Sequence, residues 1–456
     1  MRSAISLALA GLLTLSAGLA RAGDTHYQSI LAGERATGMG GAYTALADDP
    51  SATYYNPAGL VNAKNSTLSA SLSVYGFQQG AIQQALAPPS GSSFAGSLEH
   101  GVTAAFSQLT TIPGLAGSVT GIGKKDDHGR FKQAWGLSVM VLDDDENTFN
   151  QNARGPNVLQ DLSQTVIDQT TWIGLGYAYR PTDALSVGLS LDAIYRTSSR
   201  QARTLNGSAL SASGVAGDFF LDETSLQFAV AGLFAEGGVL WAASPDFSFG
   251  LSLASPSVTV FGSGTTDEIQ SYATASGPGL TDTPISGLGA NTLIPVHGRL
   301  GGVYRYGNGT IFTADLSLWG PTGYSVVNGP LAAGVQYPNF VRDVTRRPVV
   351  NLDLGGQWLL FQKYPIRGGL FTNRSSAPPI DSGPEPQLTD IDLYGLTFGF
   401  TFPSQHTETT LGFVYSYGAG EGKVPSGSAS TSGIAYLPTP TSESFLDIYL
   451  GGSYDF

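Results

Sequence analysis

Few residues in this 456-residue chain have the types and spacing that catalysis or metal binding requires. Its five histidines lack the close spacing of metal-ligand sets: His26, His100, His128, His297 and His406. Serine is abundant, yet no G-x-S-x-G sequence supplies a nucleophile elbow. A hydrolase could still place serine and histidine on adjacent strands, with His297 as the only strand-borne candidate. The residue types therefore predict neither an enzyme nor a metal centre.

Two short motifs resemble ligand-binding sequences but lack the context that those sequences need. Gly38-Met39-Gly40-Gly41 follows no strand, and Tyr43 stands where a dinucleotide fingerprint has its third glycine. The acidic run at 143–146 could bind calcium, although a run of like charges is typical of a solvated loop. We therefore expect neither a cofactor nor a bound metal ion.

The N-terminus and the composition indicate an exported protein. Residues 1–22 have the charged start, the short apolar stretch and the A-x-A-like end of a signal peptide. Beyond them no stretch of 18 apolar residues predicts a spanning helix. The chain has no cysteine, so disulfides do not stabilise it. A net charge of −13 argues against nucleic acid as a partner, because phosphates require a basic surface.

Apolar and polar residues alternate with period two from residue 66 to the C-terminus, which predicts strands. The expected strands lie at 66–78, 106–122, 131–143, 165–181, 183–201, 221–244, 246–263, 291–306, 309–322, 346–361, 363–374, 388–403, 406–420 and 442–456. Tight turns are expected at 180–183, 244–246, 307–309, 362–363 and 403–406. Long loops are expected near 144–164, 202–220, 264–290, 323–345, 375–387 and 421–441. Short and long connections alternate in this way in membrane barrels.

The polar residues at alternate positions of these strands, which would face inward, favour a water-filled lumen over a dry core. Asp192, Asp315 and Asp353 lie at these positions, and unpaired carboxylates are costly in an apolar interior. The last strand ends on Phe456 at the apolar parity, which is typical of the signal that barrel-assembly machinery recognises. We predict an all-β fold, a transmembrane antiparallel β-barrel of about 14 strands with a small N-terminal helical plug, or hatch, in its lumen. The expected domains are the signal peptide 1–22, the hatch 23–65 and the barrel 66–456.

The hatch segment carries the most specific motif of the chain. Residues 34–43 read ERATGMGGAY, and Asn56-Pro57-Ala58 follows shortly after. This segment resembles the N-terminal plug of the FadL-type outer-membrane transporters of long-chain fatty acids and other hydrophobic compounds. Weaker similarity covers 314–319, 366–370 and 415–418, and the rest agrees in architecture alone.

The resemblance implies a passive channel whose ligand leaves sideways through an opening in the barrel wall. It implies a gate role for Asn56, Pro57 and Ala58, which lie beside that opening in relatives. Gly38, Gly40 and Gly41 permit close packing and positive φ, so we place them in the gate and plug as well. Filling the lumen and gating it are compatible roles for this segment.

Candidate ligand contacts in the lumen are Arg196, Arg299, Arg305, Arg367 and Phe371. The arginines either bind a substrate carboxylate or neutralise the lumenal aspartates. We expect a monomeric channel in the outer membrane of a Gram-negative-type bacterium, surrounded by lipid and lipopolysaccharide, that takes up long-chain fatty acids or similar apolar molecules. Alternatives are a transporter of aromatic or aliphatic hydrocarbons, a general porin, and a structural or enzymatic barrel.

Overall fold

The computed structural model describes residues 25–86, 102–126, 129–155, 158–208, 219–274, 277–307, 309–329, 341–383, 386–426 and 435–456. The expected signal peptide lies outside these residues. Among these residues antiparallel strands dominate, and three short helices precede them. No described helix has the length and apolar character needed to cross a membrane.

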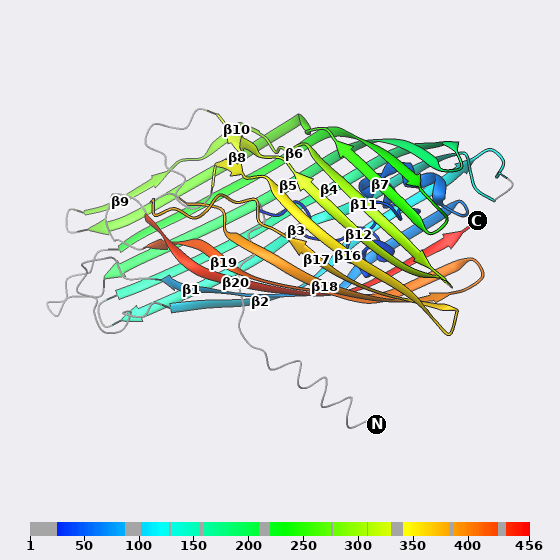
Figure 1. The fold of residues 1–456 in the computed structure, drawn as a ribbon. Coiled ribbons are helices and arrows are strands. Elements are labelled where there is room, and N and C mark those ends of the chain that lie inside the picture. The colour runs from blue at the N-terminus through cyan, green and yellow to red at the C-terminus, as the bar shows by residue number, and fades with distance from the viewer. Residues whose placement is uncertain are drawn as a thin grey trace, which may run out of the picture.

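The wall is one closed sheet with fourteen strand positions (Figure 1). Its first half comprises β1 (Thr67–Leu86), β2 (Val102–Ile122), β3 (Gln133–Gly155), β4 (Val158–Thr182), β5 (Leu185–Ser208), β6 (Phe219–Ala242), and β7 (Phe247–Ala254) with β8 (Val258–Thr274), which share one position. The second half comprises β11 (His297–Tyr306), β12 (Thr310–Trp319), β16 (Val349–Leu360), β17 (Tyr364–Asn373), β18 (Asp390–Pro403), β19 (Thr407–Ser426) and β20 (Ala435–Asp455). Pairing of β20 with β1, from Thr67↔Asp455 to Ile82↔Thr441, closes the ring. The predicted barrel is confirmed.

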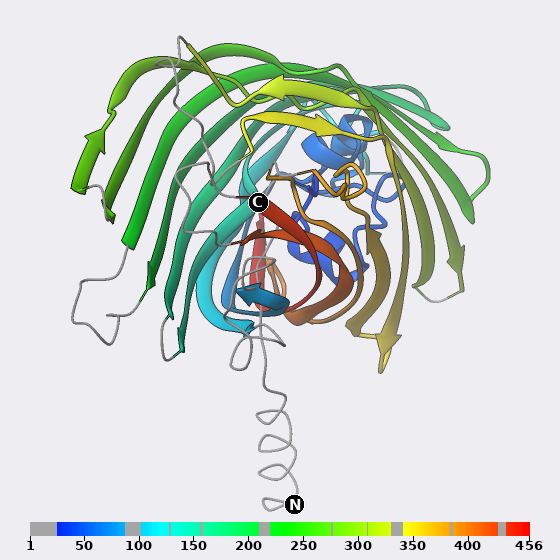
Figure 2. The same cartoon turned by 90° about the vertical axis from the view of Figure 1, so that its left-hand side faces the viewer.

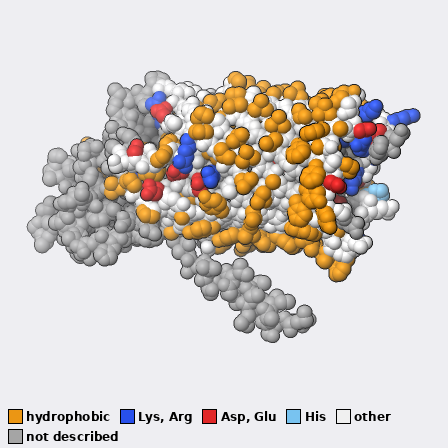
Figure 3. Space-filling view, in the orientation of Figure 1, with side chains coloured by type: hydrophobic (Ala, Val, Ile, Leu, Met, Phe, Trp, Pro, Cys, Tyr) orange, Lys and Arg blue, Asp and Glu red, His pale blue; other side chains and the backbone are white. Residues whose placement is uncertain are grey.

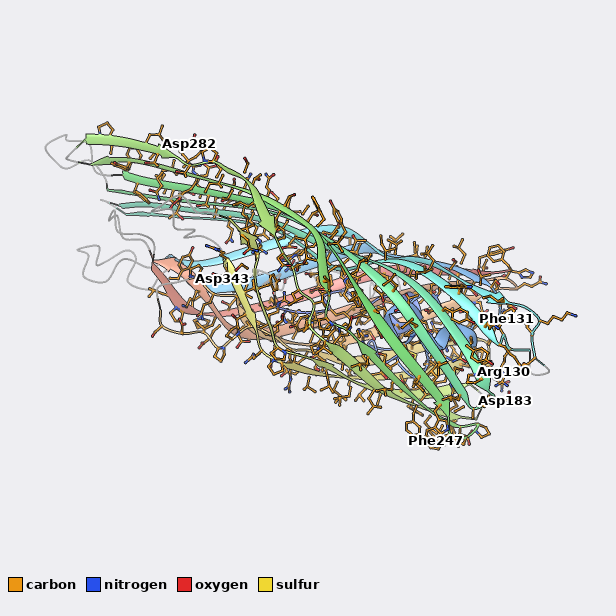
Figure 4. All side chains as sticks on the ribbon, turned by 90° about the horizontal axis from the view of Figure 1, so that it is seen from above. Arg130, Phe131, Asp183, Phe247, Asp282 and Asp343 are labelled. Carbon is orange, nitrogen blue, oxygen red and sulfur yellow. The ribbon has the colours of Figure 1, made fainter. Side chains whose placement is uncertain are left out.

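The two ends of the barrel differ. The predicted tight turns join β4–β5, β6–β7, β11–β12, β16–β17 and β18–β19 at one end, which we call the turn end. Arg130, Phe131, Asp183 and Phe247 mark the turn end in Figure 4, and Asp282 and Asp343 lie toward the opposite, loop end.

Several loops predicted at the loop end are strands in the structure. The β3 and β4 strands pair through most of 144–164, from Asp143↔Thr170 to Gly155↔Val158, and 264–290 contains the end of β8 together with β9 (Gly277–Asp282) and β10 (Ile285–Ala290). Three more short strands lie within 323–345 or at its edge: β13 (Thr322–Ser325), β14 (Val327–Asn328) and β15 (Asp343–Arg346). These predictions were wrong because backbone pairing satisfies N–H and C=O groups whatever the side-chain pattern.

Burial alternates along each wall strand as a barrel in lipid requires. On β6, Leu233, Val239 and Trp241 are exposed on the outside, whereas Asp222 and Glu236 point inward and are buried. Exposed leucine, valine, tyrosine and tryptophan side chains cover the outer wall, and charged groups gather toward its two ends (Figure 3). Phe456 follows β20 and is 74% exposed. So large an exposed apolar surface is typical of a membrane-facing wall.

The N-terminal segment fills the lumen instead of joining the wall (Figures 1 and 2). We call residues 25–65 the hatch. It contains α2 (Glu34–Gly38), α3 (Ala52–Tyr55) and the 3-10 helix η1 (Pro57–Asn62). Tyr43, Tyr54, Tyr55 and Leu60 are almost completely buried, so the hatch forms the core that the barrel otherwise lacks.

Candidate functional site: the hatch, its cavities and an interrupted seam in the wall

Glycines on the inner face of the wall seat the hatch. A Cβ atom at Gly238 would lie 2.1 Å from Asn56 Oδ1, and one at Gly369 would lie 2.3 Å from the Gly40 nitrogen. On most wall strands one glycine lies so close to the hatch that an added Cβ atom would come within 3.0 Å of a hatch atom. We call these residues the glycine belt: Gly117, Gly136, Gly176, Gly188, Gly238, Gly250, Gly301, Gly355, Gly369 and Gly451. Real Cβ atoms essentially never make contacts below 3.0 Å, so a larger residue at these positions would force hatch or wall atoms to shift.

The Asn-Pro-Ala motif joins the hatch to β5 and β6. The Asn56 side-chain amide donates to the Thr44 and Val239 carbonyls, both at 3.0 Å, and its oxygen accepts from the Ala58 N–H at 3.1 Å. Asn56 therefore caps η1 and links it to β6 at once. The β5–β6 ladder beside the motif is continuous from Leu185↔Trp241 to Gly207↔Phe219. The structure thus places the predicted gate motif against an intact part of the wall.

The three predicted hatch glycines have distinct positions. Gly40 and Gly41 adopt φ values of 67° and 84°, a backbone conformation that favours glycine. Gly38 ends α2, and a Cβ there would lie 3.1 Å from the Tyr449 hydroxyl and 3.2 Å from Arg367 Cβ. All three lie where the hatch meets the β16–β20 side of the wall.

Wall carboxylates and Arg299 hold the hatch backbone. Asp315 Oδ2 accepts from the N–H groups of Tyr43 at 2.7 Å and Thr44 at 2.6 Å. Arg299 donates to the Tyr54 carbonyl at 2.8 Å and lies 3.6 Å from Glu236. Its guanidinium also stacks over the Tyr54 ring, 4.1 Å from the centroid. Both Asp315 and Arg299 therefore bind the hatch.

The structure does not bring the four predicted arginines together. Arg196 forms a two-pronged ion pair with Asp168, at 2.8 Å for each oxygen, toward the loop end. Arg305 donates to Ser248 at 2.8 Å on the turn side of the hatch. Arg367 donates to Gln357 at 2.9 Å and Thr401 at 2.6 Å. Their partners fix these guanidinium groups in separate places.

Phe371 shares a strand face with Arg367 but lies on the other side of the hatch. Gly369, midway between them, contacts Gly40 of the hatch. Phe371 lines a cavity on the loop side, whereas Arg367 lines a space on the turn side. The predicted pair therefore cannot hold one small ligand together.

Two spaces of opposite charge flank the hatch. The outer cavity, on the loop side, has about 1050 Å³ of empty space, partly open to solvent. Its lining includes Glu34, Asp353, Glu443 and Asp447, and no lysine, arginine or histidine among the described residues. The vestibule, on the turn side, has about 1640 Å³ of empty space. Six cations line it, Arg35, Lys64, Arg130, Arg180, Arg305 and Arg367, together with Asp48, Asp183 and Glu408.

A smaller side cavity lies beside β3. Its walls include Tyr27, Trp172, Ile194 and Trp319, with Arg196 and Arg346 among the remaining lining residues. Tyr27 stacks on Trp319 with ring centroids 4.5 Å apart, and Trp319 also lines the outer cavity. The Tyr27–Trp319 pair therefore stands between the two cavities.

The wall ladder is interrupted next to the side cavity. Pairing of β2 with β3 ends at Leu115↔Met140, and the described residues of β3 beyond it pair with β4 alone. Gly114 is bulged out of the β1–β2 ladder, and Leu142 is bulged out of the β3–β4 ladder. We call this interruption the seam. Bulges of this kind end strand pairing locally.

The start of the hatch crosses the lumen to the seam. Thr25 and His26 bind Ser376 and Ile391 on one side, and the N–H groups of Ser29 and Ile30 both donate to the Leu142 carbonyl at 3.0 Å. Ile30 packs against Val141. We call Thr25–Ile30 the strap, because it joins opposite walls at the height of the seam.

Burial changes the acidity of two hatch carboxyls. Desolvation, followed by repulsion from Asp49, raises the pKa of Glu34 to about 7. Burial and the neighbouring Asp48 raise the pKa of Asp49 in the same direction. Glu34 is 8% exposed and lines the outer cavity, so its charge responds to conditions near neutrality.

Sequence reasoning missed the glycine belt, the seam and the strap. The recurrent glycines at inward parity were visible, but no pattern shows which of them face a hatch. Pro113-Gly114 within a predicted strand was the available signal for the seam, because proline lacks a ladder N–H and favours strand edges and bulges. Nothing in the sequence points to Leu142.

These features define a class of protein: a β-barrel whose lumen is closed by its own N-terminal segment and whose wall is interrupted beside it. The structure is similar to that of a Pseudomonas aeruginosa FadL homologue, with a TM-score of 0.59, 15% identity, and coverage of 94% of this chain and 100% of that one. It is similar to the Pseudomonas putida toluene transporter TodX, with a TM-score of 0.60, 13% identity, and coverage of 94% and 99%. It is also similar to the Ralstonia pickettii toluene transporter TbuX, with a TM-score of 0.55, 14% identity, and coverage of 93% of this chain and 98% of that one.

No family model and no curated protein matches the sequence. At such low identities the structural comparisons establish the fold, which is that of FadL-type channels. The resemblance predicted from the hatch motif is thereby confirmed at the level of architecture.

Proposed function

We propose that this protein is an outer-membrane channel for long-chain fatty acids or other hydrophobic molecules, which diffuse into the lumen and leave sideways into the membrane. The observation that carries the proposal is the seam beside the hatch. The straight path is filled by the hatch, which the glycine belt seats against most of the wall. The ladder of the β2–β3 pair, by contrast, is open beyond Leu115↔Met140, next to an aromatic-lined cavity.

Solvation energies support a lateral exit. A chain of ~15 methylenes gains about 12 kcal/mol on leaving water, at roughly 0.8 kcal/mol each. Release into an aqueous compartment reverses that gain, at a cost of roughly eight orders of magnitude in the equilibrium constant. Release into lipid is nearly neutral, so diffusion suffices. An open aqueous porin offers such a molecule no advantage.

The charge arrangement bears on the choice between hydrocarbons and fatty acids. Arg196, Arg299 and Arg367 already bind protein groups, and the outer cavity is acidic. This disfavours anionic cargo, and two of the similar structures are named toluene transporters. Fatty acids are the second candidate, because the side cavity combines aromatic walls with Arg196 and Arg346. If a fatty-acid carboxylate binds Arg196, the Arg196→Gln substitution should lower oleate uptake and leave toluene uptake unchanged.

Deletion of Leu142 tests the lateral route. Removing the bulged residue lets β3 continue in one register, which we expect to extend its pairing with β2 and to close the seam. Uptake of labelled toluene and oleate by cells that carry this variant should fall at least tenfold. Leu142→Ala keeps the bulge and should retain most of the uptake. Equal uptake by the deletion variant, correctly inserted, would exclude exit through the seam.

A further inference from the structure

The outer cavity, between the hatch and the β1, β12 and β16–β20 wall, has a composition unlike that of a carboxylate-binding site. Apolar side chains line it, among them Ile30, Trp319, Phe371 and Phe445. Its charged lining groups within the described residues are all acidic: Glu34, Asp353, Glu443 and Asp447. A ligand carboxylate placed here meets like charges, whereas a cation meets opposite ones.

Glu34 is the acidic group best placed to act on a ligand. It belongs to the first turn of α2 and is more than nine-tenths buried, yet it lines the cavity. Its carboxylate accepts a hydrogen bond from its own backbone N–H, and Arg367 is near enough to interact with its charge, but no described side chain donates to it. A carboxylate has about four acceptor positions, so Glu34 keeps the capacity to accept hydrogen bonds from a ligand in the cavity.

A protonated amine supplies what this arrangement lacks. An ammonium group has three hydrogen-bond donors and no acceptor, so it can serve an acidic cluster without leaving an unsatisfied lone pair. Its apolar chain or ring can pack on Trp319 and Phe371, and aromatic faces also attract a cation. Hydroxyl and amide groups of Ser73, Gln78 and Asn351 complete the lining without adding positive charge.

The vestibule strengthens the contrast. Beyond the hatch, a molecule bearing an ammonium group meets six basic side chains against three acidic ones, counted over the described residues. The turn side is therefore repulsive to the same molecule that the outer cavity attracts. A cationic amphiphile held in the outer cavity is therefore directed away from the turn end.

We infer that the outer cavity is a binding site for apolar molecules that carry a protonated nitrogen, such as alkylamines and arylalkylamines, with Glu34 as the principal contact of the head group. The inference rests on the proposed function, because it treats the cavity as a station on the uptake path. It adds the class of head group that the path accepts.

Three eight-carbon ligands test the inference: octylamine, octan-1-ol and octanoate. Their binding to the full-length protein in lipid nanodiscs at pH 7.5 is measured by calorimetry, with protein-free nanodiscs as the blank. We expect octylamine to bind at least tenfold more tightly than octanoate, because charge-assisted hydrogen bonds contribute more than neutral ones. Octanoate binding as tightly as octylamine would overturn the inference.

Variants locate the site. Glu34→Gln should lower octylamine affinity about tenfold and leave octanol affinity unchanged, and Asp353→Asn should act in the same direction. Asp183→Asn removes one carboxylate from the vestibule and serves as the matched control, with no change expected. An unchanged preference for amine over carboxylate in Glu34→Gln would show that the contact is wrong. Since the Leu142 deletion is read by cellular uptake, failure of the channel function is distinguishable from failure of this binding preference.

Discussion

The hatch meets the wall in two contrasting ways. Against β5 and β6 the ladder is continuous, and Asn56, Pro57 and Ala58 press on Gly188 and Gly238 at distances that exclude a Cβ atom. Against β3 the ladder is interrupted, and two N–H groups of the strap bind one carbonyl of a bulged residue. The first contact consists of close van der Waals packing of the hatch on wall glycines, and the second of two hydrogen bonds to the Leu142 carbonyl. We propose that the part of the hatch against β5 and β6 stays in place during transport, and that the strap is the part that releases.

A second interruption of the wall shows that a broken ladder alone is not an opening. The strand position shared by β7 and β8 breaks at 255–257, but residues 285–296 cover it. Ser257 donates to the Ile294 carbonyl and its hydroxyl accepts from the Ile294 N–H, both at 2.9 Å. Ala290 also lies close to Gly262: a Cβ atom added at Gly262 would lie 1.8 Å from the Ala290 carbonyl oxygen. Backbone around Ala290 and Ile294 therefore covers that break, whereas the strap is bound to the seam by two hydrogen bonds to Leu142.

Forcing the seated side apart should have the largest effect. Gly238→Ala places a methyl group on Asn56 Oδ1, and overpacking of this kind costs about 1–3 kcal/mol or more. We expect a displaced hatch and a several-fold higher ion conductance in planar bilayers.

Gly237→Ala is the matched control for this experiment. A Cβ atom at Gly237 would have no other atom within 4 Å, so the conductance of the Gly237→Ala variant should equal that of the parent protein. Equal conductance for both variants would show that the glycine belt does not seat the hatch.

The Asn56→Ala, Pro57→Ala double substitution tests the gate assignment directly. It removes the hydrogen bonds to the Thr44 and Val239 carbonyls, and unsatisfied buried groups cost about 1–3 kcal/mol each. Fatty-acid and toluene uptake should fall several-fold in the inserted variant. Unchanged uptake would remove the motif from the transport mechanism and leave it a structural staple.

Loosening the clasped side should have a smaller effect of opposite sign. Ser29→Pro deletes one N–H donor to Leu142, a bond worth about 0.5–1.5 kcal/mol. Toluene uptake should rise about two- to tenfold if release of the strap limits exit. Ser29→Ala keeps the N–H and should behave like the parent protein. A decrease in uptake would mean that the strap guides cargo instead of restraining it.

The acidity of Glu34 should give the smallest effect. Because its pKa is raised in the folded protein, the favoured neutral form is lost as pH rises from the ordinary value of 4.5 through about 7. The parent protein should therefore lose more thermal stability between pH 5 and pH 8 than Glu34→Gln does. The measurement is the difference in Tm between the two pH values for each protein in detergent. Equal differences would show that Glu34 does not titrate in this range.

The sequence by itself determined the barrel, its turns and the presence of a hatch. Period-two alternation fixes which side chains face lipid, and residues such as Asp192 and Asp315 at inward parity indicate a polar lumen. The residues at 34–43 and 56–58 were enough to indicate the FadL-type architecture, because this motif is specific and local.

Only the tertiary structure decided where the wall ladder is interrupted and which groups each arginine contacts. A register shift at Leu142 depends on pairing with two neighbours, and no local pattern encodes it. The partners of Arg196 and Arg299 lie 28 and 63 residues away along the chain, at Asp168 and Glu236. Inward parity says that a side chain enters the lumen, but its height relative to the hatch determines which charges and which cavity it meets.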